Sequence, residues 1–386
     1  MIIRNAHVFR DGRFQDLDVE YDGNGIRRLG PGLTGGPAID AAGRYLYAGF
    51  IDCHIHGAFG HSFCKGNYGN YAQASEHDLR DLLAQLPRYG VTSCMPTICG
   101  TTADQRLAAG MLRHIRRDVV GCDPFQLHYE GPYLSPRQLN ALATTPWMRR
   151  DPSIQDTLDM CDGDLSDVAL ISIAPELPGA IEWIRWCTAQ GVKTEIGYTQ
   201  ADSATVRAAA DAGLTQTTHF YNGFRPMHHR LNGPQTACLL DDRISCQMTL
   251  DNFHVASDWV QIAIRLKGLK RIYGLTDMVA LSGLPEGEHE IAGYGKVRID
   301  GERITSFDGT ILGANIVFNQ MMRCARDRVG LSMEQVGSIF TENPADCLSI
   351  ADRGRIEPGR RSDLVIMDRD YRVLTTIIKG QVYYQA

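Results

Sequence analysis

The sequence predicts an α/β protein in which a (β/α)8 TIM-like barrel is joined to a small β-sandwich formed by both termini. Short alternating segments occupy both ends of the chain, and eight apolar segments alternate with helix-like stretches between them. Parallel strands that are buried on both faces read as apolar runs, and eight such β-α units close into a barrel. We therefore expect the sandwich to comprise residues 1–48 and 354–386 and the barrel to comprise residues 49–353.

The two ends of the chain carry the same pattern. Alternating segments at 6–9 and 17–20 are separated by glycine-containing turn sequences, which is typical of hairpins. Segments of the same kind return at 362–367 and 373–378. Because both ends carry the same strand-like pattern, we expect them to form one sheet-based domain together.

The middle of the chain follows the pattern of parallel β-α units. Helical periodicity is present in several connecting segments, including 76–89, 180–190, 203–212 and 259–266. The eight predicted strands are 46–56, 92–98, 125–130, 168–175, 192–198, 216–221, 245–250 and 271–277.

Composition and charge exclude several classes of protein. The net charge is −6 and no dense run of Lys and Arg occurs, which argues against nucleic-acid binding. No stretch approaches the roughly 20 apolar residues of a membrane span, and charge interrupts the N-terminus before a signal peptide forms. Eleven cysteines without a C-x-x-C pair suit reduced thiols. We expect a cytoplasmic protein that binds neither nucleic acid nor membrane.

Residues that bind metals or move protons collect at the predicted strand ends. His54 and His56 end the first strand, Glu130 the third, His219 the sixth and Asp277 the eighth. Because the carboxyl ends of barrel strands meet at one face, these side chains are expected to share one site.

The chemistry of this set favours a divalent cation. His54 and His56 are two apart in a strand and point to the same side, and an inward carboxylate such as Glu130 is costly unless it is paired. Imidazole and carboxylate ligands suit Zn²⁺, with Fe²⁺ as the alternative, in a catalytic site with an open position. Singly, each residue also has a structural interpretation: hydrogen-bonded histidines, a capping glutamate, a core histidine at His219. Asp277 is expected to carry a proton between water and a leaving amine, or else to be a further ligand or anchor.

The chain resembles the N-acetylglucosamine-6-phosphate deacetylases of the amidohydrolase superfamily over nearly its whole length. The stretches that carry the resemblance occur in a shared order. They are 49–57, 128–135, 174–176, 218–222, 228–230, 276–277, 342–345 and 354–359.

The resemblance implies a role for each site residue. Glu130 and His219 would bind a metal, His54 and His56 would belong to an adjoining metal position, and Asp277 would be the general acid and base. It also implies a homodimer in which Arg230 reaches the neighbour's site. The positions that would hold the sugar phosphate are Asn222, Gly223, Arg230, His254 and the loop formed by Ile311, Leu312 and Gly313.

Two segments depart from the family pattern. Tyr198 stands where a histidine ligand is usual, and a phenol is an uncommon ligand. One ion held by His54, His56 and Glu130, with or without Asp277, is therefore as compatible with the residues as one held by Glu130 and His219, and the number of ions stays open between one and two. The segment 139–144 lacks the usual His or Gln that polarises the amide carbonyl.

The function implied is hydrolysis of the acetamide of N-acetylglucosamine 6-phosphate, in which a metal activates water, Asp277 moves the proton, and acetate leaves. Its galacto epimer or another N-acyl substrate is the alternative within the same chemistry. A catalytically inactive binding or regulatory homologue is the alternative from another class, and Tyr198 is the feature that motivates it.

Overall fold

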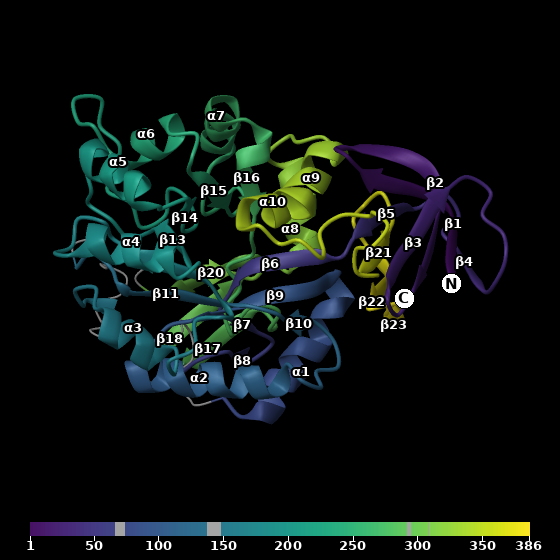
Figure 1. The fold of residues 1–386 in the computed structure, drawn as a ribbon, viewed down its shortest axis with the longest axis horizontal. Coiled ribbons are helices and arrows are strands. Elements are labelled where there is room, and N and C mark those ends of the chain that lie inside the picture. Colours follow the sequence, from purple (N-terminus) through teal and green to yellow (C-terminus); the bar gives the residue numbers. More distant parts are fainter. Residues whose placement is uncertain (66–73, 137–147, 292–294, 308) are drawn as a thin grey trace.

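A barrel and a smaller terminal sheet make up the protein (Figure 1). The computed structural model describes residues 1–65, 74–136, 148–291, 295–307 and 309–386. In Figure 1 the purple N-terminal strands and the yellow C-terminal strands lie together at one end, and the helices and strands of the barrel occupy the rest.

The barrel contains the eight predicted parallel strands, which confirms the fold class. Neighbouring strands pair in chain order, and a bridge between Ile55 and Met278 joins the first strand to the segment after the last. A two-residue strand, β10 (Asp123–Pro124), pairs with β9 beside β11. The eight barrel strands are β6 (Phe50–Ile55), β9 (Val91–Ile98), β11 (Leu127–Tyr133), β12 (Val168–Ile173), β13 (Lys193–Ile196), β14 (Gln216–Thr217), β15 (Ser245–Met248) and β16 (Ile272–Gly274).

Helices cover the outside of the barrel and bury an apolar stripe against the strands. Ser75, Thr101 and Ser332 begin their helices with capping boxes, in which a side-chain oxygen accepts from a backbone N–H of the first turn. The helices are α1 (Glu76–Gln85), η1 (Leu86–Tyr89), α2 (Thr102–Ile115), α3 (Ile154–Met160), α4 (Ala180–Ala189), α5 (Ser203–Ala212), α6 (Pro234–Leu240), α7 (Ser257–Lys267), η4 (Leu269–Arg271), α8 (Phe318–Asp327), α9 (Met333–Phe340) and α10 (Glu342–Leu348).

Both termini contribute strands to one sheet, as predicted. β5 of the N-terminal part pairs antiparallel with β21 of the C-terminal part. Ile26 and Ile377 come from strands near opposite ends of the strand order but share one apolar cluster, so the sheet bends around a common core. The boundaries at 48/49 and 353/354 stay predictions. The sheet contains β1 (Ile2–Arg10), β2 (Arg13–Asp22), β3 (Gly25–Gly30), β4 (Ala38–Asp40), β5 (Tyr45–Ala48), β21 (Leu364–Met367), β22 (Val373–Ile378) and β23 (Gln381–Gln385).

Alternation along the central strands of this sheet attaches it to the barrel. Leu46 and Leu364 face the core of the sheet itself. Tyr47 and Val365, one residue later in each strand, belong to the core of the barrel. The period of two therefore buries both faces, and the two parts share a continuous interior.

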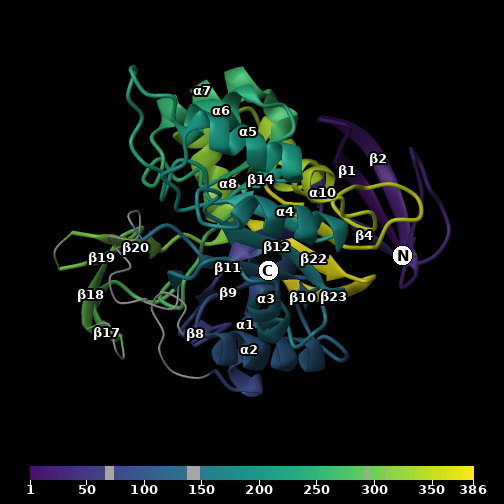
Figure 2. The same ribbon diagram turned by 60° about the vertical axis from the view of Figure 1, so that its left-hand side comes forward.

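A second small sheet follows the last barrel strand and was not predicted. Its four antiparallel strands lie to one side of the barrel in Figure 2. The segment Ile311 to Gly313, which was expected to be a loop, lies in its last strand, because residues 303–305 pair with 311–314. The strands are β17 (Gly287–Ile291), β18 (Gly295–Asp300), β19 (Arg303–Ser306) and β20 (Ile311–Ala314), and a short hairpin, β7 (Gly57–Ala58) with β8 (His61–Ser62), follows β6.

No helix among the described residues has the length and hydropathy needed to cross a membrane. All eleven cysteines lie within the described residues, all are buried, and none forms a disulfide.

Close packing between β16 and α9 gives a prediction on stability. A Cβ at Gly274 would overlap the ring of Phe340. Gly274→Ala is expected to lower the free energy of unfolding by about 1–3 kcal/mol through overpacking. Gly110→Ala is the control, because Gly110 lies within α2 and a Cβ there would meet open space, and it is expected to stabilise by about 0.5–1 kcal/mol. Thermal unfolding of both variants measures the difference, and equal midpoints would contradict it.

Candidate active site

The predicted site residues meet at the carboxyl ends of the barrel strands. His54 lies in β6 and His56 directly follows it, His219 comes two residues after β14, and Asp277 comes three residues after β16. Glu130 lies within β11, which continues to Tyr133 and does not end at the glutamate. The backbone pairing that closes the barrel extends into the site. Asp277 N donates to the His54 carbonyl at 3.0 Å.

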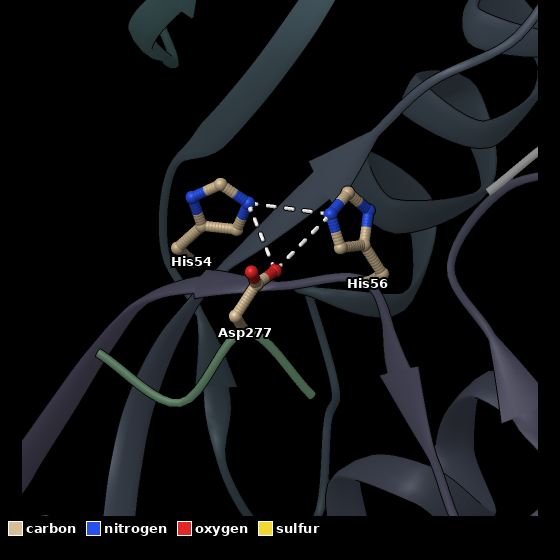
Figure 3. A group of neighbouring side chains, drawn as sticks. All are labelled: His54, His56 and Asp277. Carbon is tan, nitrogen blue, oxygen red and sulfur yellow. Dashed lines mark hydrogen bonds and ion pairs between the residues drawn. The ribbon is translucent and has the colours of Figure 1, made fainter. Parts of the chain in front are cut away.

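His54, His56 and Asp277 form the centre of the cluster (Figure 3). The two Nε2 atoms are 3.2 Å apart, and Asp277 Oδ1 lies 3.4 Å from His54 Nε2 and 3.5 Å from His56 Nε2. Both imidazoles are fully buried, whereas the Asp277 side chain is 18% exposed. Burial lowers the pKa of His54 to about 4, although the Asp277 carboxylate works in the opposite direction. His54 is therefore neutral near pH 7.

Glu130 joins this centre to His219. Its Oε1 lies 2.8 Å from His219 Nε2 and 3.7 Å from His54 Nε2, and its Oε2 lies 3.3 Å from His56 Nε2. Burial opposes the charge on Glu130, yet hydrogen bonds from His219 and His56 hold its pKa well below the usual range. Burial also opposes a charge on His219, but Glu130 raises the pKa of His219 to about 9.

Three residues at this face have a backbone conformation that L-residues rarely adopt. The φ angles are +43° at Tyr198, +23° at His219 and +54° at Asp277. Each of them follows a different barrel strand. Such conformations concentrate at functional sites because the surrounding structure must hold them in place. The local backbone thus turns each side chain at the point where its strand ends.

Cys99 and Tyr198 complete the immediate surroundings. Cys99 follows β9, and its Sγ lies 3.6 Å from His56 Nδ1 and 3.7 Å from Glu130 Oε2. Sequence analysis did not single out Cys99, although its position after the second strand follows the same strand-end rule. The Tyr198 ring stands edge-on to the His219 ring with centroids 5.1 Å apart. Tyr198 therefore lies beside His219, where the resemblance implies a further ligand.

The donor set fits a divalent cation. One nitrogen of each of His54 and His56 and an oxygen of Asp277 lie within 4.8 Å of one another, and so do atoms of His56, Cys99 and Glu130. Two imidazole nitrogens that face each other beside carboxylates are electrostatically favourable when a cation or a proton lies between them. Zn²⁺ and Fe²⁺ both accept such ligands.

Buried polar groups lie beneath these residues. His54 Nδ1 is 3.0 Å from Gln247 Oε1, and Gln247 in turn donates to Glu195. His128 Nε2 bonds the same carboxylate at 2.7 Å. Burial opposes the charge of Glu195, yet His128 brings its pKa to about 2. The sequence offered no signal for Glu195 or Gln247, because both lie in short strands that contain other polar residues, β13 (Lys193–Ile196) and β15 (Ser245–Met248).

The residues expected to hold a sugar phosphate are only partly gathered. His254 Nδ1 lies 2.6 Å from Asp251 Oδ2, and although burial disfavours its charge, this contact raises the pKa of His254. Asn222 donates to the His219 carbonyl at 3.2 Å, and Gly223 packs against the Tyr198 ring. These three flank the metal-ligand candidates.

The other expected contacts lie farther out. Arg230 is exposed on the loop before α6. Gly313 packs on Val279, two residues beyond Asp277, and Leu312 shares an apolar cluster with Val279, whereas Ile311 is 41% exposed. The segment 139–144, where a carbonyl-polarising residue is usual, lies outside the described residues.

Comparison with known proteins agrees with this fold and site. Residues 45–383 match a family model described as the amidohydrolase family. The chain belongs to that family.

Within the family, similarity is to deacetylases of amino-sugar phosphates. The N-acetylglucosamine-6-phosphate deacetylase of Bacillus subtilis (strain 168) is 29% identical, covering 99% of this chain and 94% of that protein. The N-acetylgalactosamine-6-phosphate deacetylase of Shewanella sp. (strain ANA-3) is 28% identical, covering 88% and 84%. A solved structure of a mutant N-acetyl-D-glucosamine-6-phosphate deacetylase from Mycobacterium smegmatis, in complex with N-acetyl-D-glucosamine-6-phosphate, has a TM-score of 0.86 and 25% identity, covering 100% and 99%.

The raised pKa of His219 gives a prediction for the metal-free protein. His219 is protonated in the fold up to about pH 9 but only to about pH 6.5 when unfolded, so its stabilising charge is present below pH 6.5 and is lost as the pH rises to 9. The metal-free protein should lose roughly 3 kcal/mol of stability over this interval. Thermal unfolding with a chelator present measures the loss.

His219→Gln keeps a hydrogen-bond donor for Glu130 but cannot titrate, so its melting temperature should fall less over the same interval. His77→Gln, at a surface histidine on α1, is the control and should behave like the original chain. Equal pH profiles for the His219 variant and the original chain would contradict the assignment.

Proposed function

We propose that the chain is a metal-dependent deacetylase that converts N-acetylglucosamine 6-phosphate to the amino-sugar phosphate and acetate. The observation that carries the proposal is the convergence of His54, His56, Glu130 and Asp277 at one barrel face. Similarity to curated deacetylases over 99% of the chain supports the substrate class. The galacto epimer is the second candidate, because a relative of similar identity is named for it.

His54, His56, Glu130 and Asp277 are proposed to hold one divalent cation, with Zn²⁺ as the expected ion and Fe²⁺ as the alternative. A bound cation supplies Lewis acidity toward an acetyl carbonyl and lowers the pKa of water. His219 is proposed to hold Glu130 Oε1, since their contact at 2.8 Å is shorter than the distances from Glu130 to His54 or His56. Glu130 Oε2 lies nearer His56. Glu130 is then oriented from one side while it faces the cation from the other.

Asp277 is proposed to move the proton. Its side chain is the one member of this group of four with substantial exposure, at 18%, so it reaches the opening where substrate and water enter. Burial raises the pKa of Asp277, but the neighbouring His54 and His219 lower it below the usual value, so the group is a carboxylate near pH 7 and can accept a proton from water. The protonated Asp277 carboxyl group can then return this proton to the leaving amine.

The substrate is proposed to lie beside Tyr198 and His254. Asp251 holds His254 through the ring nitrogen and accepts from the backbone of Phe253 and His254, so the ring is oriented. A histidine held with a raised pKa favours an anionic group such as a phosphate. Asn222 and Gly223 line the same side of the site. Gly313 and Leu312, in β20, pack with Val279, which lies two residues beyond Asp277.

A homodimer and a cytoplasmic location remain proposals. Arg230 lies on an exposed loop with Met227 and Leu231, beside a hollow of about 800 Å³ that Leu240 also lines. Exposed apolar side chains of this kind favour a protein contact, which suits an arginine that reaches a neighbouring site. Eleven buried thiols without a disulfide support a reducing compartment.

The direct test is acetate release from both 6-phosphorylated epimers and from their unphosphorylated forms, with the metal content of the same sample measured. We expect turnover of a phosphorylated epimer with a divalent metal bound, and a lower kcat/KM without the phosphate. Asp277→Asn should reduce kcat by about 10²–10⁴-fold because the proton carrier is lost.

Asp16→Asn is the matched control, because this exposed residue lies in β2 of the terminal sheet, outside the barrel and the proposed dimer contact, and it should retain activity. Absence of both bound metal and acetate release would favour a binding or regulatory homologue. Release from a non-phosphorylated N-acyl compound alone would refute the substrate class.

Tyr198 gives a separate prediction on metal number. The tyrosine ring lies against His219, where a histidine would add a nitrogen ligand next to Glu130 and His219. Tyr198→His is expected to raise the metal content from one ion toward two per chain. Metal analysis after dialysis measures it, with Tyr198→Phe as the control that should keep one ion. Two ions in the original chain would contradict the proposed single-ion site.

A further inference from the structure

A buried hydrogen-bond chain leads from Glu195 to His54 beneath the proposed cation ligands. Glu195, Gln247 and His54 are all fully buried, so no exposed group competes for these bonds. Gln247 Nε2 donates to Glu195 Oε2, and Gln247 Oε1 lies 3.0 Å from His54 Nδ1. The other oxygen of Glu195 receives the remaining donors, which are His128 Nε2, Ser172 Oγ and Thr218 Oγ1.

The Glu195 carboxylate decides which atom donates and which accepts in each hydrogen bond of this chain. An ionised carboxylate only accepts hydrogen bonds, so Gln247 must turn its amide N–H toward Glu195. The carbonyl oxygen of Gln247 then faces His54 and also only accepts. His54 must therefore carry its proton on Nδ1, which leaves the lone pair of Nε2 directed at His56 and Asp277.

The groups around Nε2 would not select this tautomer by themselves. Asp277 Oδ1 at 3.4 Å and His56 Nε2 at 3.2 Å can each accept a hydrogen bond from a proton on His54 Nε2. A histidine protonated there cannot bind a metal through that nitrogen. The choice between the two tautomers is therefore made on the Nδ1 side of the ring.

We propose that Glu195 and Gln247 are positioning residues that hold His54 in its metal-binding tautomer before any cation arrives. This inference rests on the cation site of the proposed function. Neither residue touches the substrate or the cation; Glu195 acts through Gln247, and Gln247 acts through His54. Outer partners of this kind commonly set the orientation and tautomer of a histidine ligand.

The test uses two variants of the full chain and one control. Gln247→Met keeps the side-chain volume but removes the acceptor for His54. The double variant Glu195→Gln with Gln247→Glu exchanges the two groups, so that residue 247 still accepts from His54 and residue 195 still donates to residue 247. Gln216→Met is the control, because Gln216 is a buried glutamine in the neighbouring strand that bonds Tyr273 and the Cys347 carbonyl.

Two measurements are made on each protein. Competition with a chromophoric chelator gives the affinity for Zn²⁺, and ¹⁵N NMR of histidine-labelled, metal-free protein shows which nitrogen of His54 carries the proton. Gln247→Met is expected to weaken Zn²⁺ binding by about 10–100-fold and to lose the single Nδ1-protonated form. The exchanged pair should recover affinity and tautomer, and Gln216→Met should keep both.

Unchanged affinity and tautomer in Gln247→Met would overturn the inference, and so would an exchanged pair as impaired as Gln247→Met. Failure of the original chain to bind Zn²⁺ would instead count against the proposed function. In that event the NMR measurement on metal-free protein still decides the tautomer, so the two failures are distinguishable. Thermal unfolding of each variant verifies that the fold is retained.

Discussion

The pairing that closes the barrel is the constraint on which the site depends. Ile55 and Met278 form a parallel bridge, and Asp277 N and His56 N donate to backbone carbonyls across the same seam. The two histidines and the aspartate belong to segments more than 200 residues apart, and they meet because the first strand and the segment after the last strand are neighbours in a closed sheet. Asp52 strengthens the seam by accepting from Thr276, and its own burial raises its pKa to about 7.

A second requirement is that every buried charge in the site has a partner. Glu130 is bonded by His219 and lies close to His56, and Glu195 receives four donors from four different side chains. An unpaired carboxylate in this interior would be strongly unfavourable, whereas a fully bonded one is rigid. Because each bond has a defined direction, the charges beneath the site also orient the imidazoles above them. Stability of the interior and preparation of the metal-binding face are therefore consequences of the same contacts.

Parts of the molecule differ in how well their patterns predict them. The barrel strands were predictable because they alternate with helices of clear periodicity, although β13, β14 and β15 contain several polar residues. The terminal strands were predictable because apolar and polar residues alternate along them. The sheet β17 to β20 was missed because β17 (Gly287–Ile291) is largely polar and exposed, with a single buried side chain at Ile291. Its identity depends on the antiparallel pairing with β18, which no short segment reveals by itself. Antiparallel pairing with β19 likewise places residues 311 to 313 in a strand, although their sequence resembles a loop.

The sequence by itself determined the barrel, the shared terminal sheet, and the candidate set His54, His56, Glu130, His219 and Asp277, because strand ends of a parallel barrel converge whatever their side chains are. Tertiary structure decided which of these candidates contact one another: His219 lies against Glu130, and Asp277 against the two histidines. It also brought in Cys99 and Gln247, which no motif marks, and placed the Tyr198 ring against His219. These contacts join residues from different strands, and their distances and hydrogen-bond directions are set by barrel closure and side-chain packing, which spacing along the chain does not encode.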